Sequence, residues 1–244
     1  MHPNIENKVA VITGGSRGIG FAIAGALIEN GAQVLIGSRT EADVQGATEA
    51  LNGLTPAGRA KGKTLDVRDY KQVEQFMATA EREFGGIDIL VNNAGIGMFH
   101  MVDNMPPEEW DAVIQTNLSG VFYCIRAAVG SMKRRGGGYI FNISSLAGKN
   151  AFAGGAAYNA SKFGLNGLSE AAMLDLRYHN IRLSYIMPGS VETDFGTSHR
   201  AKPDPESWKL HAKDVAQTVV DLLKFDSRAM LSRVEMRPSK PPRK

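Results

Sequence analysis

The sequence predicts an α/β fold in which a parallel sheet of seven strands carries helices on both faces. Short apolar and β-branched runs alternate with stretches of helical length along the whole chain, and this alternation places the strands parallel to one another. Right-handed crossovers then leave few topologies, of which the doubly wound sheet is the commonest. The 244 residues contain no internal repeat and no interior low-complexity linker, so we expect a single domain over residues 1–236.

The first half of the chain holds four of the seven predicted strands. The run 8–12 is short and apolar, as in a buried strand. The next stretch is rich in Ala, Ile and Leu and ends at Gly31, because glycine commonly follows the last residue of a helix. The elements expected here are the strand 8–12, the helix 19–30, the strand 33–38, the helix 41–52, the strand 63–66, the amphipathic helix 70–84 and the strand 87–91.

The second half continues the alternation. The strand 139–143 is β-branched and aromatic, and it lies between three glycines and the pair Ser144 and Ser145. The stretch 192–208 contains Gly196, Pro203 and Pro205, and it is predicted to be the one long irregular segment. The other elements expected are a long helix 108–134 that breaks near Asn117, a helix that opens at Tyr158, the strand 181–187, the helix 214–225 and the strand 231–236.

Composition excludes several classes of protein. Apolar residues make up 43% of the chain and charged residues 22%, as in globular proteins. No run approaches 18 apolar residues and the N-terminus has no apolar signal core, so we expect a cytoplasmic protein without a membrane span. The five histidines show no metal-ligand spacing, so we expect no metal. Part of the net charge of +3 lies in a basic, Pro-rich tail at 237–244, which we expect to be mobile; binding of nucleic acid would need a larger basic face.

The best candidates for chemistry are Tyr158 and Lys162, which are four residues apart and therefore share one face of a helix. A free phenol has a pKa of about 10 and is a poor acid or base near neutral pH. A nearby ammonium favours the phenolate and lowers that pKa, so the tyrosine can exchange a proton with a reacting oxygen. Ser145, at the end of a strand, could hold the same oxygen by a hydrogen bond. The pattern Tyr-x-x-x-Lys is also a common surface pair, so the rest of the chain must decide between the two readings.

A glycine-rich loop, Thr13-Gly-Gly-Ser-Arg-Gly-Ile-Gly20, follows the first strand. Its spacing, G-x-x-x-G-x-G, differs from the common dinucleotide fingerprint. Glycines let the backbone approach a pyrophosphate closely, and the N-terminus of the next helix supplies N–H groups and a positive dipole. A tight turn alone would also explain the glycines, but their place between strand and helix favours phosphate binding in a Rossmann-type domain. The residues expected at the phosphates are Gly14, Ser16, Arg17, Gly18, Ile19 and Gly20.

The end of the second strand predicts the cofactor. An acidic residue there would bind the ribose 2′-hydroxyl of NAD, whereas an arginine favours the 2′-phosphate of NADP. This strand ends at Ser38 and Arg39 without an acid at its tip, and Arg17 lies in the glycine loop. Two guanidinium groups on one phosphate make a strong site, so NADP(H) is predicted. The alternative is that Arg39 is only a surface residue.

Taken together, these residues resemble the short-chain dehydrogenase/reductase family over residues 7 to about 225. The resemblance implies an NADPH-dependent oxidoreductase that reduces a ketone or 3-oxoacyl group, similar to 3-oxoacyl-acyl-carrier-protein reductases and NADP-dependent carbonyl reductases. The matched motifs are the Gly14, Gly18 and Gly20 loop, Asp66-Val67, Asn92-Asn93-Ala94-Gly95, Asn117, Ser145, Tyr158 with Lys162, and Pro188-Gly189.

The resemblance also implies a role for each matched position. Tyr158 would be the catalytic acid/base, and Lys162 would lower its pKa and hold the nicotinamide ribose. Ser145 would orient the substrate carbonyl, and Asn117 would break its helix and hold a water that relays protons to Lys162. In the cofactor site, Asp66 and Val67 would meet the adenine, Asn93, Ala94 and Gly95 would line the floor, and Pro188, Gly189, Val191 and Thr193 would bind the nicotinamide carboxamide.

The substrate is less well defined. Many 3-oxoacyl reductases end in a strand followed by Val-Asp-Gly-Gly, whereas this chain continues from Ser232 to Pro238 without that motif, which puts an acyl substrate in doubt. Apolar side chains line most ligand pockets, although each candidate could equally belong to the core. The candidate pocket walls are Leu146, Phe152 and Phe195, with Trp208 and Met98 as further candidates.

Partners and competing functions remain open at this stage. The basic run 133–135 could dock an acidic carrier protein, or it could be a solvated helix end that complements the helix dipole. By resemblance, the helices that begin near Glu108 and Tyr158 would pair in a homodimer or homotetramer. A catalytically idle NADP-binding regulator and a nucleotide-sugar epimerase are the alternatives to a reductase. Intact Ser145, Tyr158 and Lys162 argue against the regulator, and the glycine spacing and short substrate segment argue against the epimerase.

Overall fold

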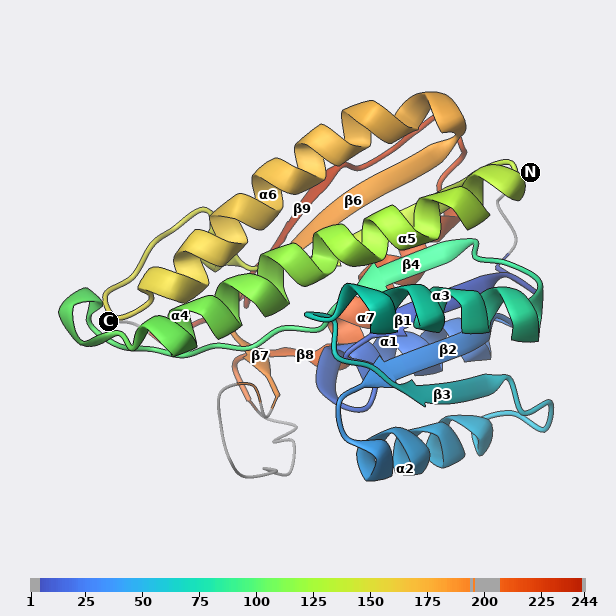
Figure 1. The fold of residues 1–244 in the computed structure, drawn as a ribbon, viewed down its shortest axis with the longest axis horizontal. Coiled ribbons are helices and arrows are strands. Elements are labelled where there is room, and N and C mark those ends of the chain that lie inside the picture. The colour runs from blue at the N-terminus through green and yellow to red at the C-terminus, as the bar shows by residue number, and fades with distance from the viewer. Residues whose placement is uncertain (1–4, 194, 196–206, 243–244) are drawn as a thin grey trace.

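One seven-stranded sheet organises the chain, and each strand in it runs parallel to its neighbours (Figure 1). The computed structural model describes residues 5–193, 195 and 207–242. The strand order is β3-β2-β1-β4-β5-β6-β9, which confirms the predicted doubly wound parallel sheet. The strands are β1 (Val9–Thr13), β2 (Gln33–Ser38), β3 (Ala60–Thr64), β4 (Ile89–Asn92), β5 (Gly138–Ile143), β6 (Ile181–Pro188) and β9 (Arg233–Met236).

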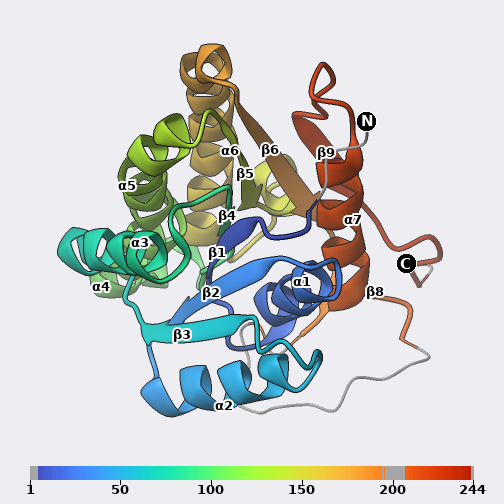
Figure 2. The same ribbon diagram turned by 90° about the vertical axis from the view of Figure 1, so that its right-hand side faces the viewer.

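Helices cover both faces of the sheet, as Figure 2 shows. One face packs against α1 (Gly18–Glu29), α2 (Glu41–Asn52) and α7 (Ala212–Lys224). The other face packs against α3 (Tyr70–Phe84), α5 (Gly120–Arg134) and α6 (Ala156–Leu176). Two apolar layers result, and strands β1, β2, β4, β5 and β6 contribute buried side chains to both of them. This explains why the central strands are apolar throughout and do not alternate.

The order of the strands places the cleft of the fold between β1 and β4. From β1 the chain winds outward through β2 to β3, and it then returns to the other side of β1 and winds outward through β4, β5, β6 and β9. The connections after β1 and β4 therefore leave in opposite directions. In open α/β sheets a ligand binds in the crevice that this divergence opens at the carboxyl ends of the strands.

The third predicted strand is displaced in the structure, and the predicted break in the long helix is confirmed. The third strand is Ala60–Thr64, three residues earlier at its start than the predicted 63–66. It is an edge strand, and its register with β2 pairs Val34 with Ala60. Because its side chains are largely exposed, the apolar pattern of the sequence did not show where this strand begins. The long helix is divided into α4 (Pro107–Ile114) and α5 by a π-helical turn, η2 (Gln115–Ser119), which confirms the predicted break near Asn117.

Several short elements have no clear signal in the sequence. A two-stranded parallel pair, β7 (Val191–Glu192) with β8 (Leu210–His211), lies at the two ends of the stretch that was predicted to be irregular. The rest of that stretch, apart from Thr193, Phe195 and residues 207–208, falls outside the described residues, as do positions 243–244 of the basic tail. The 3-10 turns are η1 (Val102–Asn104), η3 (Leu146–Gly148) and η4 (Arg177–His179).

Candidate active site

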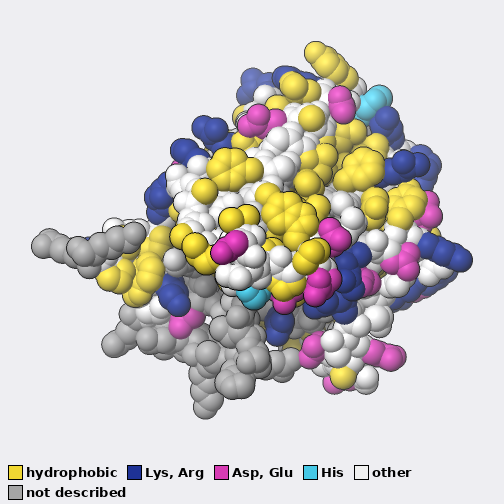
Figure 3. All heavy atoms as spheres, turned by 60° about the vertical axis from the view of Figure 1, so that its left-hand side comes forward, with side chains coloured by type: hydrophobic (Ala, Val, Ile, Leu, Met, Phe, Trp, Pro, Cys, Tyr) yellow, Lys and Arg dark blue, Asp and Glu magenta, His cyan; other side chains and the backbone are white. Residues whose placement is uncertain are grey.

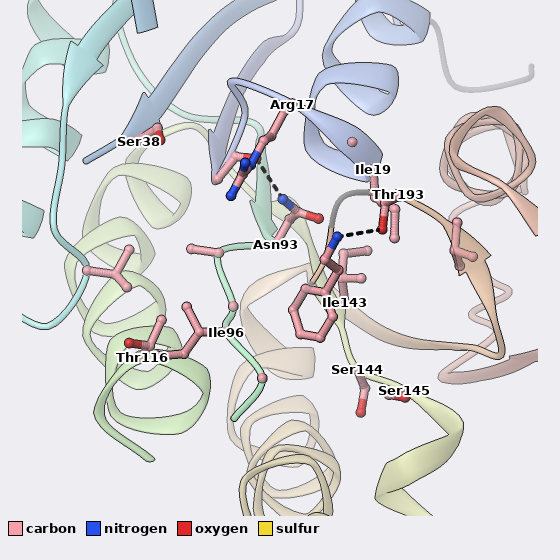
Figure 4. Close-up of a pocket in the computed structure, with 18 of the residues that line it drawn as sticks. Arg17, Ile19, Ser38, Asn93, Ile96, Thr116, Ile143, Ser144, Ser145 and Thr193 are labelled. Carbon is pink, nitrogen blue, oxygen red and sulfur yellow. Dashed lines mark hydrogen bonds between the residues drawn. The ribbon is translucent and has the colours of Figure 1, made fainter. Parts of the chain in front are cut away.

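A cavity of about 420 Å³ opens at the carboxyl ends of the strands, where the chain diverges after β1 and β4. Figure 4 shows Arg17 and Ser38 at one end of it and Ser144 and Ser145 at the other. Every predicted cofactor residue except Gly20 lines this cavity. Those residues are Gly14, Ser16, Arg17, Gly18, Ile19, Ser38, Arg39, Asp66, Val67, Asn93, Ala94, Gly95, Tyr158, Lys162, Pro188, Gly189, Val191 and Thr193.

The glycine loop is shaped by close contact with the turn after β4. Gly14 has a φ of +65°, which a side chain would strain, and a Cβ atom at Gly20 would lie 2.3 Å from the Gly14 carbonyl oxygen. Asn93 fixes the loop by donating from its Nδ2 to the carbonyl oxygens of Thr13 at 3.1 Å and Gly14 at 2.9 Å. Gly20 therefore acts on the site by its close packing and not as a lining residue.

The glycine-loop end of the cavity suits a phosphate group. Helix α1 begins at Gly18, and no side chain caps its first N–H groups. A Cβ at Gly18 would meet only the Thr193 side chain, at 3.5 Å, so the backbone there is open to the cavity. Arg17 and Arg39 are exposed and line the same end. Backbone N–H groups, a helix dipole and two guanidinium groups together make a fit for a polyphosphate.

The Asp66 carboxylate is less available to contact the adenine than the sequence suggested. Nε of Arg68 lies 3.0 Å from each carboxylate oxygen of Asp66, and the Arg68 backbone N–H also donates to it. These hydrogen bonds with Arg68 lower the pKa of Asp66 despite its partial burial. The carboxylate is therefore ionised and engaged by its neighbour, while its backbone and Val67 form the cavity wall.

At the other end of the cavity, Tyr158, Lys162 and Ser145 come together from two elements. Tyr158 and Lys162 lie one turn apart on α6, and Ser145 follows β5. Nζ of Lys162 donates a 2.9 Å hydrogen bond to the Ile143 carbonyl oxygen and lies 5.7 Å from the centroid of the Tyr158 ring. The Ser145 side chain lies near enough to Tyr158 to lower the pKa of its phenol. A phenol, a hydroxyl and an amine thus surround one point of the cavity.

Burial governs the pKa of both Tyr158 and Lys162 in this structure. Burial raises the pKa of the Tyr158 phenol, and the hydrogen bond with Ser145 only partly opposes that rise. Burial also lowers the pKa of Lys162 to about 8. Desolvation dominates because both side chains are largely removed from solvent. Tyr158 is therefore fully protonated near neutral pH and is set up to donate a proton.

The two adjacent serines have different partners. The hydroxyl of Ser144 donates to Oδ1 of Asn166 at 2.6 Å, and Nδ2 of Asn166 donates to the Gly148 carbonyl oxygen. Ser145 is extended, and its Oγ accepts from the Ala147 N–H at 3.1 Å, which caps the turn η3. The Ser145 hydroxyl still reaches Tyr158, which favours Ser145 over Ser144 as the residue that binds the reacting oxygen.

Asn117 lies in the π-helical turn and is fully buried. Its Oδ1 accepts from the Ile96 N–H and its Nδ2 donates to the Ile96 carbonyl oxygen, each at 2.8 Å. Nδ2 also donates to Ser161. The side chain therefore anchors the segment after Gly95 that lines the cavity, although Asn117 itself is not among the lining residues.

Of the predicted substrate walls, Phe195 and Met98 line the cavity, whereas Leu146, Phe152 and Trp208 are not among its described lining residues. Leu146 instead lies behind Gly189. Phe152 packs against Phe99, whose ring stands 5.8 Å from the ring of Tyr158. The sequence reasoning missed Phe99, although its place just after the β4 turn could have found it. It also missed the lining residues Gly37, Leu65, Ile96, Gly97, Thr116, Ile143 and Ser144.

Over the described part of the chain, no group of three or more His, Cys, Asp and Glu side chains is arranged to hold a metal ion. Likewise, none of the described helices combines the length and the apolar character needed to cross a membrane.

Comparison with known proteins assigns a family. The model of the family described as short chain dehydrogenase matches residues 8–204. The chain is 44% identical over 191 residues to a 3alpha-hydroxysteroid dehydrogenase of Mediterraneibacter gnavus, covering 78% of this chain and 76% of that protein. It is 38% identical over 191 residues, with the same coverage of both, to 3-oxoacyl-(acyl-carrier-protein) reductase FabG of Escherichia coli strain K12.

Solved structures agree with that assignment. An alcohol dehydrogenase from the archaeon Thermococcus sibiricus, solved with 5-hydroxy-NADP, superposes with a TM-score of 0.88 at 30% identity, over 97% of this chain and 99% of that one. A metagenomic short-chain oxidoreductase in complex with NADP superposes with a TM-score of 0.84 at 35% identity, over 98% and 100% of the two chains.

Proposed function

Because the chain belongs to the short-chain dehydrogenase family and is an oxidoreductase, we propose that it reduces a ketone or 3-oxoacyl group to the secondary alcohol with NADPH. The observation that carries the proposal is the convergence of Tyr158, Ser145 and Lys162 on one end of a cavity whose other end suits phosphate. A nucleotide cofactor that spans the cavity would bring its reactive ring to that point.

The protein's share of the reaction is to hold the carbonyl oxygen and supply a proton. Bound NADPH supplies the hydride that reduces the carbonyl carbon. Negative charge then develops on the carbonyl oxygen, where the Ser145 hydroxyl and the Tyr158 phenol stabilise it. Tyr158 gives up its proton to this oxygen. Its raised pKa suits this direction, because the phenol stays protonated until a more basic alkoxide forms beside it.

Lys162 and Asn117 support this proton transfer. As Tyr158 loses its proton, the ammonium of Lys162 stabilises the phenolate that forms nearby. Lys162 is also placed to hold the nicotinamide ribose, and the Ile143 carbonyl fixes its orientation. Asn117 keeps the Gly95 and Ile96 segment in place beneath them, and we propose that its turn also binds the water that relays protons to Lys162.

We propose NADP(H) as the cofactor and assign its 2′-phosphate to Arg17 and Arg39. Both arginines line the phosphate end of the cavity, and Ser38 lies beside them at the tip of β2. Asp66, the acid among the described lining residues of the cavity, is paired with Arg68. Structural neighbours solved with NADP or 5-hydroxy-NADP support the choice.

The test is the loss of NADPH absorbance in the presence of acetoacetyl thioester, small ketones and aldehydes, with NADH compared in parallel. The relatives include both a hydroxysteroid dehydrogenase and a 3-oxoacyl reductase by name, so the ketones of the panel include cyclic ones. Reduction of a carbonyl with NADPH supports the proposal. No reduction with either cofactor by a protein that binds NADPH would contradict it and favour the catalytically idle NADP-binding regulator.

We also propose that the protein assembles as a homodimer or homotetramer through α4, α5 and α6. Figure 3 shows hydrophobic side chains gathered on the end of the molecule where α4 lies. Trp110, Phe122 and Phe163 are exposed on these helices, whereas Leu165 and Leu176 of α6 face the core. A mass near that of one chain in light scattering would contradict this assembly.

A carrier protein is the less supported partner. Of the basic run 133–135, Arg134 is paired with Glu81 and Arg135 with Asp88. These two charges are therefore partly compensated within the chain, which weakens the run as a basic docking site for an acidic partner.

A further inference from the structure

Three phenylalanine side chains form a cluster around the ring of Tyr158. The rings of Phe99 and Phe195 stand 5.8 and 5.6 Å from that of Tyr158, at 69° and 53° to it. The ring of Phe152 stands 5.8 Å from that of Phe99. The three residues come from separate segments: the loop after β4, the segment after β7 and the loop before α6. Tertiary folding therefore gathers them beside Tyr158, with Phe195 in the lining of the cavity and Phe99 and Phe152 next to it.

These rings are held in place and are also accessible. Phe99 and Phe152 are each 47% exposed and Phe195 is 44% exposed, so a large part of each ring faces solvent. Two glycines let the rings lie against the backbone: a Cβ at Gly97 would be 2.8 Å from Phe99 and 2.9 Å from Phe195, and a Cβ at Gly155 would be 2.6 Å from Phe152. A folded protein that leaves three aromatic rings this exposed around one phenol presents a binding surface for something apolar.

Charge is divided between the two ends of the cavity. The charged residues among its described lining are Arg17, Arg39, Asp66 and Lys162. The first three belong to the phosphate end, and Lys162 is buried beneath Tyr158 with its ammonium on the Ile143 carbonyl. Among the described residues that line the cavity, only the buried Lys162 carries a charge at this end, so the lining does little to compensate the desolvation of a charged substrate there.

From this arrangement, and resting on the proposed carbonyl reduction, we propose that the substrate is a bulky, uncharged ketone with its carbonyl on or beside a ring system. The ring packs among Phe99, Phe152 and Phe195 while the carbonyl oxygen reaches Tyr158 and Ser145. Flat or fused rings match aromatic side chains that present edges and faces at 49° to 69° to one another. A flexible acyl thioester would gain less, because it would lose more conformational freedom for the same contact.

The experiment compares kcat/KM with saturating NADPH for 2-decalone, 2-butanone and acetoacetyl-coenzyme A. We expect 2-decalone to exceed 2-butanone by at least about 100-fold, because its additional carbons are buried among the rings. Phe99→Ala and Phe152→Ala should each lower kcat/KM for 2-decalone about tenfold, mainly through KM. Both variants should change 2-butanone less than about twofold, and NADPH binding, followed by its fluorescence, should stay unchanged.

Two further variants distinguish a specific effect of the phenylalanine cluster on substrate binding from a general loss of activity. Phe225→Ala removes a phenylalanine that is 42% exposed at the far end of α7, and it should leave all three substrates unaffected. Gly97→Ala removes no ring but displaces Phe99 and Phe195, and it should lower kcat/KM more for 2-decalone than for 2-butanone.

Three results would overturn the inference. One is equal kcat/KM for 2-decalone and 2-butanone in the unaltered protein, and another is an equal loss on all substrates in the Phe99 and Phe152 variants. The third is a preference for acetoacetyl-coenzyme A that these variants leave intact, which would make the substrate a thioester and still leave the proposed reductase standing. Failure to reduce any of the three carbonyls despite NADPH binding would overturn the proposed function itself.

Discussion

The ammonium nitrogen of Lys162 lies 5.7 Å from the centroid of the Tyr158 ring, and its hydrogen bond goes to the Ile143 carbonyl and not to the phenol. Lys162 therefore acts on Tyr158 through space. Its charge matters most when Tyr158 has given up its proton, because that is when an anion stands beside it. The pair is arranged to stabilise the product of proton donation more than to ionise the resting phenol.

Tyr158→Phe should lower turnover about 10²- to 10⁴-fold, since it removes the proposed general acid while leaving the ring in place. NADPH affinity, measured by fluorescence titration, should change little. Tyr178→Phe is the matched control, because Tyr178 is 88% exposed on η4 and is not among the cavity lining. Turnover close to that of the unaltered enzyme in Tyr158→Phe would rule out this mechanism.

The pH dependence of reduction should follow Lys162. Burial lowers the pKa of Lys162 to about 8, so its charge is present below that pH and is lost above it. The raised pKa of Tyr158 keeps the proton donor intact over the same range. We therefore expect kcat/KM for the ketone to be level up to pH 7 and to fall above about pH 8. A profile that stays level to pH 9.5, with NADPH binding confirmed at each pH, would show that the Lys162 charge is not needed.

Arg39→Glu should reverse the electrostatic attraction for the 2′-phosphate and lower the kcat/KM ratio of NADPH to NADH at least about tenfold. Arg228→Glu is the control, because the Arg228 side chain is highly exposed and pairs with Asp226 away from the cavity. An unchanged cofactor ratio in Arg39→Glu would mean that the phosphate lies elsewhere.

Asn117→Leu should destabilise the fold by about 2 kcal/mol, because the Ile96 N–H and C=O would both lose their partner. Turnover should fall as well, since Ile96 and Gly95 line the cavity. Asn150→Leu, a change at an exposed position on the loop before α6, should cost much less in urea unfolding. Equal stability of the two variants would show that the Asn117 bonds do not hold this segment.

Asp88 directly precedes β4, at the amino ends of the strands. Its charge should make the stability of the fold depend on pH. Burial opposes ionisation of Asp88, but hydrogen bonds from Arg135 and the Val9 N–H, with the charge of Lys8, lower its pKa overall. A carboxylate with a lowered folded pKa stabilises the fold above its unfolded pKa of about 4, and this contribution is lost as the pH falls through the folded value.

Asp88→Asn should therefore lower the free energy of unfolding by about 2 kcal/mol between pH 5 and 8, and the difference should shrink below about pH 4. Glu83→Gln breaks ion pairs with Lys61 and Arg82 at the surface and should change stability little. A difference between Asp88→Asn and the unaltered protein that persists undiminished at pH 3 would contradict the role of the charge.

The sequence alone determined the sheet, its parallel strands and most of the residues that line the cavity. Those features depend on local signals: apolar runs of strand length, a glycine loop between strand and helix, and Tyr158 and Lys162 one helical turn apart. Such signals are read from neighbours in the chain, because strand and helix periods fix which side chains share a face.

Tertiary structure decided the rest, because the deciding contacts join residues far apart in the chain. Asn93 reaches Gly14 across 79 positions, and Ser144 is occupied by Asn166, which leaves Ser145 for Tyr158. The direction of the Tyr158 pKa depends on burial, which no spacing along the chain reveals. The gathering of Phe99, Phe152 and Phe195 around Tyr158 likewise exists only once three separate loops meet at the carboxyl edge of the sheet.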